Sequence, residues 1–282
     1  MPRDAVKAGE DQTTVGNLMF SAIRNNVVAF SNWRRMTWLA VSQLLNNQTR
    51  GSKLAMILAL LEPLVLIAVL YFIRGYLRGG MPNFGPSMLL FLCSGILPFF
   101  MFVRISSRIG GSSTQPSSRL PGLSALDIYI ATVTLNSIIW LGMLIAVFVG
   151  MWLSGILQAR PASIVDCATP VILLILFGAG LGMINNAINR YIPLWNRFYA
   201  IFSRGLILTS GIMMIVDFYP FWLRKWAVLN PLSHAIEWFR VGVYGDRYPH
   251  IFLDPGYFIT WTIVVLFLGF VVDRAALRRL GT

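Results

Sequence analysis

Residues 128–157 read IYIATVTLNSIIWLGMLIAVFVGMWLSGIL, a stretch without a single charged side chain. A helix needs about 20 mostly apolar residues to cross the roughly 30 Å hydrocarbon core of a bilayer, and a longer run can tilt or extend beyond it. Five other runs approach this length, and one of them is unusual because it contains Arg204. We therefore predict an all-α integral membrane protein with six transmembrane helices, at about 54–73, 87–103, 128–157, 168–188, 198–216 and 257–272.

The composition favours a membrane protein over a water-soluble or nucleic-acid-binding one. Hydrophobic residues make up 56% of the chain and charged residues only 12%, whereas a soluble domain has roughly a quarter charged residues. The formal net charge is +12, but the basic residues lie mostly between apolar runs, as expected for lipid headgroup contacts and topology signals. Cys93 and Cys167 stand in or beside apolar runs, so no disulfide is expected. The N-terminus lacks the apolar core of a cleavable signal peptide.

The distribution of basic residues orients the predicted bundle. Cytoplasmic loops of membrane proteins carry an excess of Lys and Arg. Placing the N-terminal arm in the cytoplasm puts fifteen basic residues on the inside and seven on the outside, with Arg204 left within a span. Both termini are therefore predicted to be cytoplasmic. The seven outer residues are Arg74, Arg78, Arg160, Arg224, Lys225, Arg240 and Arg247.

Two segments are predicted to be neither spans nor simple loops. Residues 27–47 place apolar side chains at a loose three-to-four spacing among polar ones, which favours an amphipathic interface helix along the inner surface. A polar lead-in to the first span is the alternative. Residues 218–255 are rich in aromatics and interrupted by prolines, and irregular backbone at membrane depth has to face protein or water. We interpret about 220–248 as short re-entrant helices that dip from the outer face, with a plain external loop as the alternative.

Several kinds of chemistry are missing from the sequence. A phosphate-binding loop needs Gly-Lys before Ser or Thr, but none of Lys7, Lys53 and Lys225 follows a glycine, so this chain is not expected to hydrolyse ATP. No catalytic residue and no metal site are expected either. The one acid deep within a predicted span is Glu62, beside a proline. It either satisfies the kinked backbone, pairs with a basic residue such as Arg204, or acts in transport.

Two stretches of the chain resemble a known family. The first runs from RRMTW at 34–38 through TRGSK at 49–53 to LLEPL at 60–64, and the second is LNPLSHAIEWFR at 229–240. Together with the order of features over about 25–280, they resemble the ABC-2 type permeases of polysaccharide export, in particular the capsular polysaccharide export permeases of Gram-negative inner membranes. The resemblance implies a transmembrane domain over 25–282, preceded by a polar tail at 1–24.

The resemblance also implies partners and a function. The chain would form a homodimer above two copies of a separate nucleotide-binding subunit, which binds ATP and Mg, so that this chain itself holds no cofactor. The cargo would be a capsular or related cell-surface polysaccharide, lipid-linked at one end, that crosses the bacterial inner membrane. A periplasmic co-polymerase and outer-membrane export proteins would be further partners, and no nucleic acid is involved. Export of O-antigen, teichoic-acid-type polymers, lipids or drugs is the alternative, followed by an ion-coupled secondary carrier.

The resemblance implies that two segments couple this chain to the ATPase. They are the amphipathic arm and the cytoplasmic loop from Arg104 to Leu126, which follows the second span. This loop is the longest internal loop of the predicted topology, and a disordered linker is the alternative interpretation of it. The basic residues that we expect to take part in coupling are Arg34, Arg35, Arg104, Arg108 and Arg119.

The stretch 229–240 also makes physical sense by itself. Asn230 is a good N-cap, and Pro231 suits the first position of a helix. Glu237 and Arg240 stand three residues apart, where they can pair on one helix face. A capped surface helix without substrate contact is the alternative. The candidates for a structural or gating role are therefore Glu62, Asn230, Pro231, His234, Glu237 and Arg240.

A sugar polymer is polar along its length and needs a lined passage. Aromatic rings stack on sugar faces and let them slide, and a guanidinium can meet the phosphate of a lipid-linked end. Aromatic side chains also form interfacial belts that face lipid, which is the alternative role for many of them. The candidates for lining the passage are Tyr71, Phe72, Phe99, Phe100, Arg204, Trp222, Trp226 and Trp238.

Overall fold

The computed structural model describes residues 41–42, 53–77, 84–85, 87–112, 124–156 and 159–280, and within these ranges the chain forms helices and no strands. The long helices are α2 (Lys53–Leu77), α3 (Met88–Gly110), α4 (Ala125–Leu153), α5 (Ile164–Tyr191) and α9 (Pro255–Leu280). The shorter ones are α6 (Trp195–Thr209), α7 (Phe221–Leu229) and α8 (Pro231–Tyr244), with 3-10 turns at Val216–Phe218 and Gly245–Arg247.

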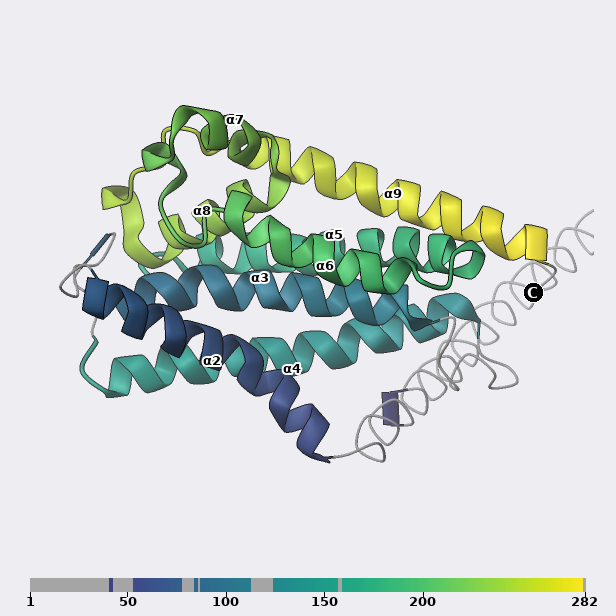
Figure 1. Cartoon of the computed structure of the whole chain (residues 1–282), viewed down its shortest axis with the longest axis horizontal. Coiled ribbons are helices and arrows are strands. Elements are labelled where there is room, and N and C mark those ends of the chain that lie inside the picture. The colour runs from purple at the N-terminus through teal and green to yellow at the C-terminus, as the bar shows by residue number, and fades with distance from the viewer. Residues whose placement is uncertain are drawn as a thin grey trace, which may run out of the picture.

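The long helices lie side by side and alternate in direction from α2 to α5 (Figure 1). α3 is the central helix: most of its residues are buried, and it packs against α2, α4, α5, α6 and α8. Among the described residues, four helices are long and apolar enough to cross a membrane: α3, α4, α5 and α9. α4 and α9 also leave many large apolar side chains exposed, which suits helices that face lipid. The predicted all-α membrane architecture is therefore confirmed.

Glycines on α5 allow three helices to pack closely. A Cβ added at Gly182 would lie 2.7 Å from the Cβ of Ile109 in α3. One added at Gly180 would lie 2.7 Å from the backbone of Leu266 in α9. Helices in lipid associate through such close contacts between small residues, because lipid provides no hydrophobic driving force between them. The run GAGLG at 178–182 therefore fixes how α5 sits between α3 and α9.

Five of the six predicted spans correspond to long helices. α3 and α9 extend further than predicted at their C-terminal ends, to Gly110 and Leu280. The predicted span at 198–216 is wrong in its extent, because α6 ends at Thr209. At about 1.5 Å per residue, its 15 residues reach only about 22 Å, less than the thickness of the hydrocarbon core. The number of complete crossings therefore stays a prediction.

The chain turns away from the axis of α6 at Gly211, which has φ +70°. Glycine adopts this left-handed conformation without steric cost. The apolar residues that follow do not continue the helix, and Ile212 and Ile215 are instead completely buried in the protein interior. The apolar run that looks like the end of a span is thus used for tertiary packing.

α7 and α8 fold back beside the start of α9, at the upper left of Figure 1. With 9 and 14 residues, neither can cross a membrane. α8 is buried over most of its length and packs against α5, α3 and α9. A plain external loop therefore does not describe this segment, and its re-entry into the membrane stays a prediction.

The predicted interface helix at 27–47 lies outside the described residues except for Val41 and Ser42, which are helical. Val41 packs against Ala131 and Leu135 of α4, so this one position contacts the transmembrane bundle. The polar tail at 1–24 also lies outside the described residues.

Candidate functional site

A cavity of about 200 Å³ lies between α2, α3 and α6. Its charged groups come from Glu62, Arg104 and Arg204, one from each helix, and Phe99 and Phe100 of α3 add aromatic rings. Three candidates for the passage thus meet here, next to one candidate for gating. The remaining lining residues are Val103, Ser107, Ala200, Ser203 and Ile207.

Glu62 forms an ion pair with Arg104, and not with Arg204 as suggested from the sequence. α2 and α3 are consecutive and antiparallel. Glu62 lies fifteen residues before the end of α2 at Leu77, and Arg104 sixteen residues after the start of α3 at Met88, so the two side chains reach the same depth. Opposite charges that pair in this way reduce the cost of placing ionised groups among apolar helices. The pair supports a structural role for Glu62.

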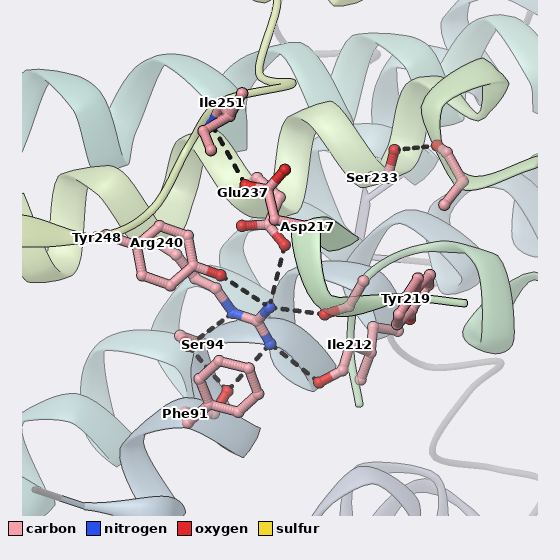
Figure 2. Close-up of polar contacts among 12 residues, drawn as sticks. Phe91, Ser94, Ile212, Asp217, Tyr219, Ser233, Glu237, Arg240, Tyr248 and Ile251 are labelled. Carbon is pink, nitrogen blue, oxygen red and sulfur yellow. Dashed lines mark hydrogen bonds and ion pairs between the residues drawn. The ribbon is translucent and has the colours of Figure 1, made fainter. Parts of the chain in front are cut away.

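Arg240 is completely buried and joins α8 to two other parts of the chain (Figure 2). Its Nη1 donates to the carbonyl oxygen of Gly211 at 2.6 Å, and its Nη2 donates to those of Ile212 at 2.9 Å and Phe91 at 3.3 Å. Its Nε donates to Ser94 Oγ at 3.4 Å, and its guanidinium carbon lies 3.8 Å from the centre of the Phe91 ring. The guanidinium therefore fastens α8 to α3 and to the turn after α6.

Glu237 supplies the charge opposite Arg240. Its completely buried carboxylate lies 3.5 Å from Nη1, which confirms the predicted pair on one face of α8. Tyr248 accepts a further bond from Nη1 through its hydroxyl at 3.4 Å. A guanidinium has five N–H donors, and these acceptors account for all of them. Arg240 therefore has no donor left for a cargo, which assigns the pair a structural role.

Asn230 and Pro231 begin α8 as predicted. Asn230 Oδ1 accepts from the N–H of Leu232 at 3.1 Å, and Pro231 is the first helical residue. Asn230 Nδ2 also donates to the hydroxyls of Thr209 and Ser210, at 3.0 and 3.1 Å. The cap of α8 is thus bonded to the end of α6, and because most of α8 is buried it is not a surface helix, whereas its contact with substrate stays untested.

His234 joins the end of α7 to the start of α9. The backbone N–H of Asp254 donates to its Nδ1 at 3.1 Å, which leaves Nε2–H to donate to the carbonyl of Val228 at 2.8 Å. The ring is therefore neutral, and burial lowers the pKa of the imidazole. Both nitrogens are engaged in structural bonds. Within the described ranges, no three His, Cys, Asp or Glu side chains gather closely enough to hold a metal ion.

A second buried polar cluster, not predicted from the sequence, connects α4, α5 and α9. The Tyr129 hydroxyl donates to Asp273 Oδ1 at 2.8 Å, and Asn186 Nδ2 donates to that hydroxyl at 2.6 Å. Arg190 lies 3.2 Å from the same carboxylate. The sequence does contain a signal for it, because the polar run NNAINR at 185–190 ends an otherwise apolar helix.

The other passage candidates do not line the cavity between α2, α3 and α6. Trp238 is half-buried, and its Nε1 donates to Asp166 Oδ1 at 3.3 Å. The remaining four are exposed on the surface of α2 or α7, where either a passage or a lipid-facing belt would use them: Tyr71, Phe72, Trp222 and Trp226.

The coupling candidates are only partly described. Arg104 and Arg108 lie inside α3, so the predicted loop from Arg104 to Leu126 begins seven residues later, after Gly110. Arg104 pairs with Glu62 at the cavity between α2, α3 and α6, and its role in coupling stays a prediction. Arg108 is half-buried in the last turn of α3. The candidates outside the described residues are Arg34, Arg35 and Arg119.

The comparisons with known proteins agree with this architecture. Residues 35–244 match the family described as ABC-2 type transporter, well over half of the chain. The polysialic acid transport protein KpsM of Escherichia coli is 27% identical over 225 residues, which cover 79% of this chain and 86% of KpsM. The capsule polysaccharide export inner-membrane protein CtrC of Neisseria meningitidis is 24% identical over 218 residues, which cover 75% of this chain and 79% of CtrC.

Proposed function

Because the chain belongs to the ABC-2 type transporter family, we propose that it is the membrane permease of an exporter that moves capsular or related cell-surface polysaccharide across the bacterial inner membrane. The observation that carries this proposal is the similarity to KpsM and CtrC, which covers at least 75% of this chain in each case. Membership of this family also argues against an ion-coupled secondary carrier.

The permease would work as a homodimer above two copies of a separate ATPase subunit, with both termini in the cytoplasm. The partner binds ATP and Mg, because no lysine of this chain follows a glycine as a phosphate-binding loop requires. ATP binding in the partner would bias the passage between closed and open states. A periplasmic co-polymerase and outer-membrane export proteins complete the proposed assembly.

Disruption of the gene tests the function directly. We expect the surface polysaccharide to disappear while polymer accumulates in the cytoplasm, and both changes to be reversed by a plasmid copy of the wild-type gene. Normal surface polysaccharide in the disrupted strain, or loss of the polymer from the cytoplasm as well, would contradict an export role.

Purification tests the division of labour between subunits. The chain alone should not hydrolyse ATP, and hydrolysis should appear only when a second polypeptide copurifies. The control is the same complex carrying a substitution of the phosphate-binding lysine in that second polypeptide. Robust turnover by this chain, free of contaminants, would overturn the proposal.

A further inference from the structure

The cavity between α2, α3 and α6 carries more positive than negative charge. Two guanidinium groups, those of Arg104 and Arg204, face it together with the single carboxylate of Glu62. Arg104 and Glu62 neutralise each other in their ion pair. Arg204 is exposed, and no carboxylate in the described part of the chain forms an ion pair with it. One guanidinium with its donors is therefore left to meet a ligand.

The position of Arg204 among apolar side chains indicates that its charge has a role in binding. It stands nine residues after the start of α6 at Trp195, which is about 14 Å along the helix at 1.5 Å per residue. Its neighbours on α6 include the exposed apolar residues Ile201, Phe202 and Leu208. An ionised group among apolar side chains of a membrane protein is expensive, and it usually marks a path or site for a charged or polar ligand.

The size and lining of the cavity define the class of ligand. A volume of about 200 Å³ corresponds to roughly six or seven water molecules at about 30 Å³ each, room for one phosphate group with some of its water. Guanidinium groups match phosphate oxygens through paired N–H donors. The rings of Phe99 and Phe100 add apolar surface to the lining of the cavity, and a charge-assisted bond is stronger beside such surface than in bulk water.

We propose that this cavity binds the phosphate group of an anionic ligand, with Arg204 as the principal contact. Arg104 is the second cation, and Glu62 holds it in place and limits the total positive charge of the cavity. The inference rests on the proposed function, since the phosphate at the lipid-linked end of an exported polymer is the ligand that such a permease would meet. The headgroup of a membrane phospholipid and a free phosphate ion share this chemistry.

The full chain, purified in phosphatidylcholine nanodiscs, is suitable for the test. Inorganic pyrophosphate is titrated in one arm, and phosphatidylglycerol is added to the discs in the other, with bound lipid measured by native mass spectrometry. Arg204→Gln should weaken the binding of at least one probe by about tenfold, the loss expected for one charge-assisted contact. Loss in the lipid arm alone identifies a headgroup site, and loss in the pyrophosphate arm alone a site for free phosphate.

Arg197→Gln is the matched control, because Arg197 is an exposed arginine on the same helix that does not line the cavity. Arg204→Lys keeps the charge but loses the paired donors, so its affinity should lie between those of the wild type and Arg204→Gln. Glu62→Gln should tighten binding, because it removes the carboxylate that neutralises Arg104. Unchanged binding in Arg204→Gln, or an equal loss in Arg197→Gln, would overturn the site. Since binding is measured without export, such a result would leave the surface-polysaccharide experiment to decide the proposed function independently.

Discussion

At the scale of single residues, the buried guanidinium of Arg240 restricts what its neighbours can be. A Cβ added at Gly95 of α3 would lie 2.6 Å from Nη2 of Arg240 and 3.3 Å from the Cα of Ile212. Gly95→Ala should therefore lower the free energy of unfolding by about 1–3 kcal/mol, as overpacking of a filled interior does. The measurement is the thermal midpoint of the purified protein in detergent.

Gly142→Ala on α4 is the control for this substitution, because nothing lies within 4 Å of a Cβ added there. Alanine is a better helix former than glycine by about 1 kcal/mol, so this variant should be unchanged or slightly more stable. Similar thermal midpoints for the two variants would contradict the prediction, because they would show that there is room for a methyl group at Gly95 beside Arg240.

The pair between Glu237 and Arg240 leads to a second prediction. Both side chains are completely buried, so Arg240→Gln leaves a carboxylate without its counter-charge, a change that costs about 3–5 kcal/mol. The double variant Glu237→Gln/Arg240→Gln removes the uncompensated charge and should regain part of that loss. Thermal midpoints and membrane abundance of both variants measure the difference. A double variant that is less stable than Arg240→Gln would show that burial of an unpaired Glu237 carboxylate is not the source of the instability.

At the scale of elements, the sequence was sufficient to predict the features that depend only on residues close together in the chain. The N-cap at Asn230, the first position of Pro231 and the pairing of Glu237 with Arg240 all depend on residues within one helix turn or two, and all were predictable. The end of α6 depends on the carbonyl groups of Gly211 and Ile212, which bond Arg240 almost thirty residues later. The apolar run at 198–216 contains no information about Arg240, so it could not show where α6 ends.

Contacts between helices were harder to predict, because they depend on relative depth and rotation. The partner of Glu62 could have been deduced from equal distances to the connection between α2 and α3, since antiparallel neighbours place such positions side by side. The cluster of Tyr129, Asn186 and Asp273 brings together three helices. Predicting it requires the rotation of each helix about its own axis. Polar residues at the ends of apolar helices indicate such a cluster but not its membership.

His234 makes a testable connection between α7 and α9. The folded protein favours the neutral imidazole, because burial lowers its pKa below the ordinary value of 6.5 and Nδ1 accepts from the N–H of Asp254. The unfolded chain binds a proton first as the pH falls. The stability due to the neutral ring is therefore complete above pH 6.5 and is lost as the pH falls toward the folded-state pKa.

Thermal midpoints of the wild type and of His234→Gln test this connection. Between about pH 8 and about pH 5, the wild type should lose more stability than the variant, whose amide does not titrate. All other titrating groups are common to the two proteins, so their contributions cancel in the comparison. Parallel pH profiles would show that His234 does not tie α7 to α9 through its neutral form.

At the scale of the whole molecule, the alternation of the helices separates the chain into two ends. The ends of α3, α5 and α9 at Gly110, Tyr191 and Leu280 lie at one side of the bundle, on the right of Figure 1. The connection between α4 and α5 lies at the opposite side. The basic residues beyond α5 and along the last turns of α9 therefore share one end, which is the pattern that the positive-inside rule assigns to the cytoplasm.

Cysteine labelling in intact cells tests this orientation. In a background without Cys93 and Cys167, single cysteines replace four exposed arginines that lie at the two ends of the bundle: Arg160, Arg197, Arg247 and Arg279. A membrane-impermeant reagent should label positions 160 and 247 from outside, whereas 197 and 279 should react only after the inner membrane is permeabilised. The reason is energetic, because moving the basic inner end outward would place the larger share of Lys and Arg on the translocated side. The opposite labelling pattern would show that the bundle has the inverse orientation. The cavity with Arg204 would then lie in the outer half of the bundle, away from a polymer that arrives from the cytoplasm.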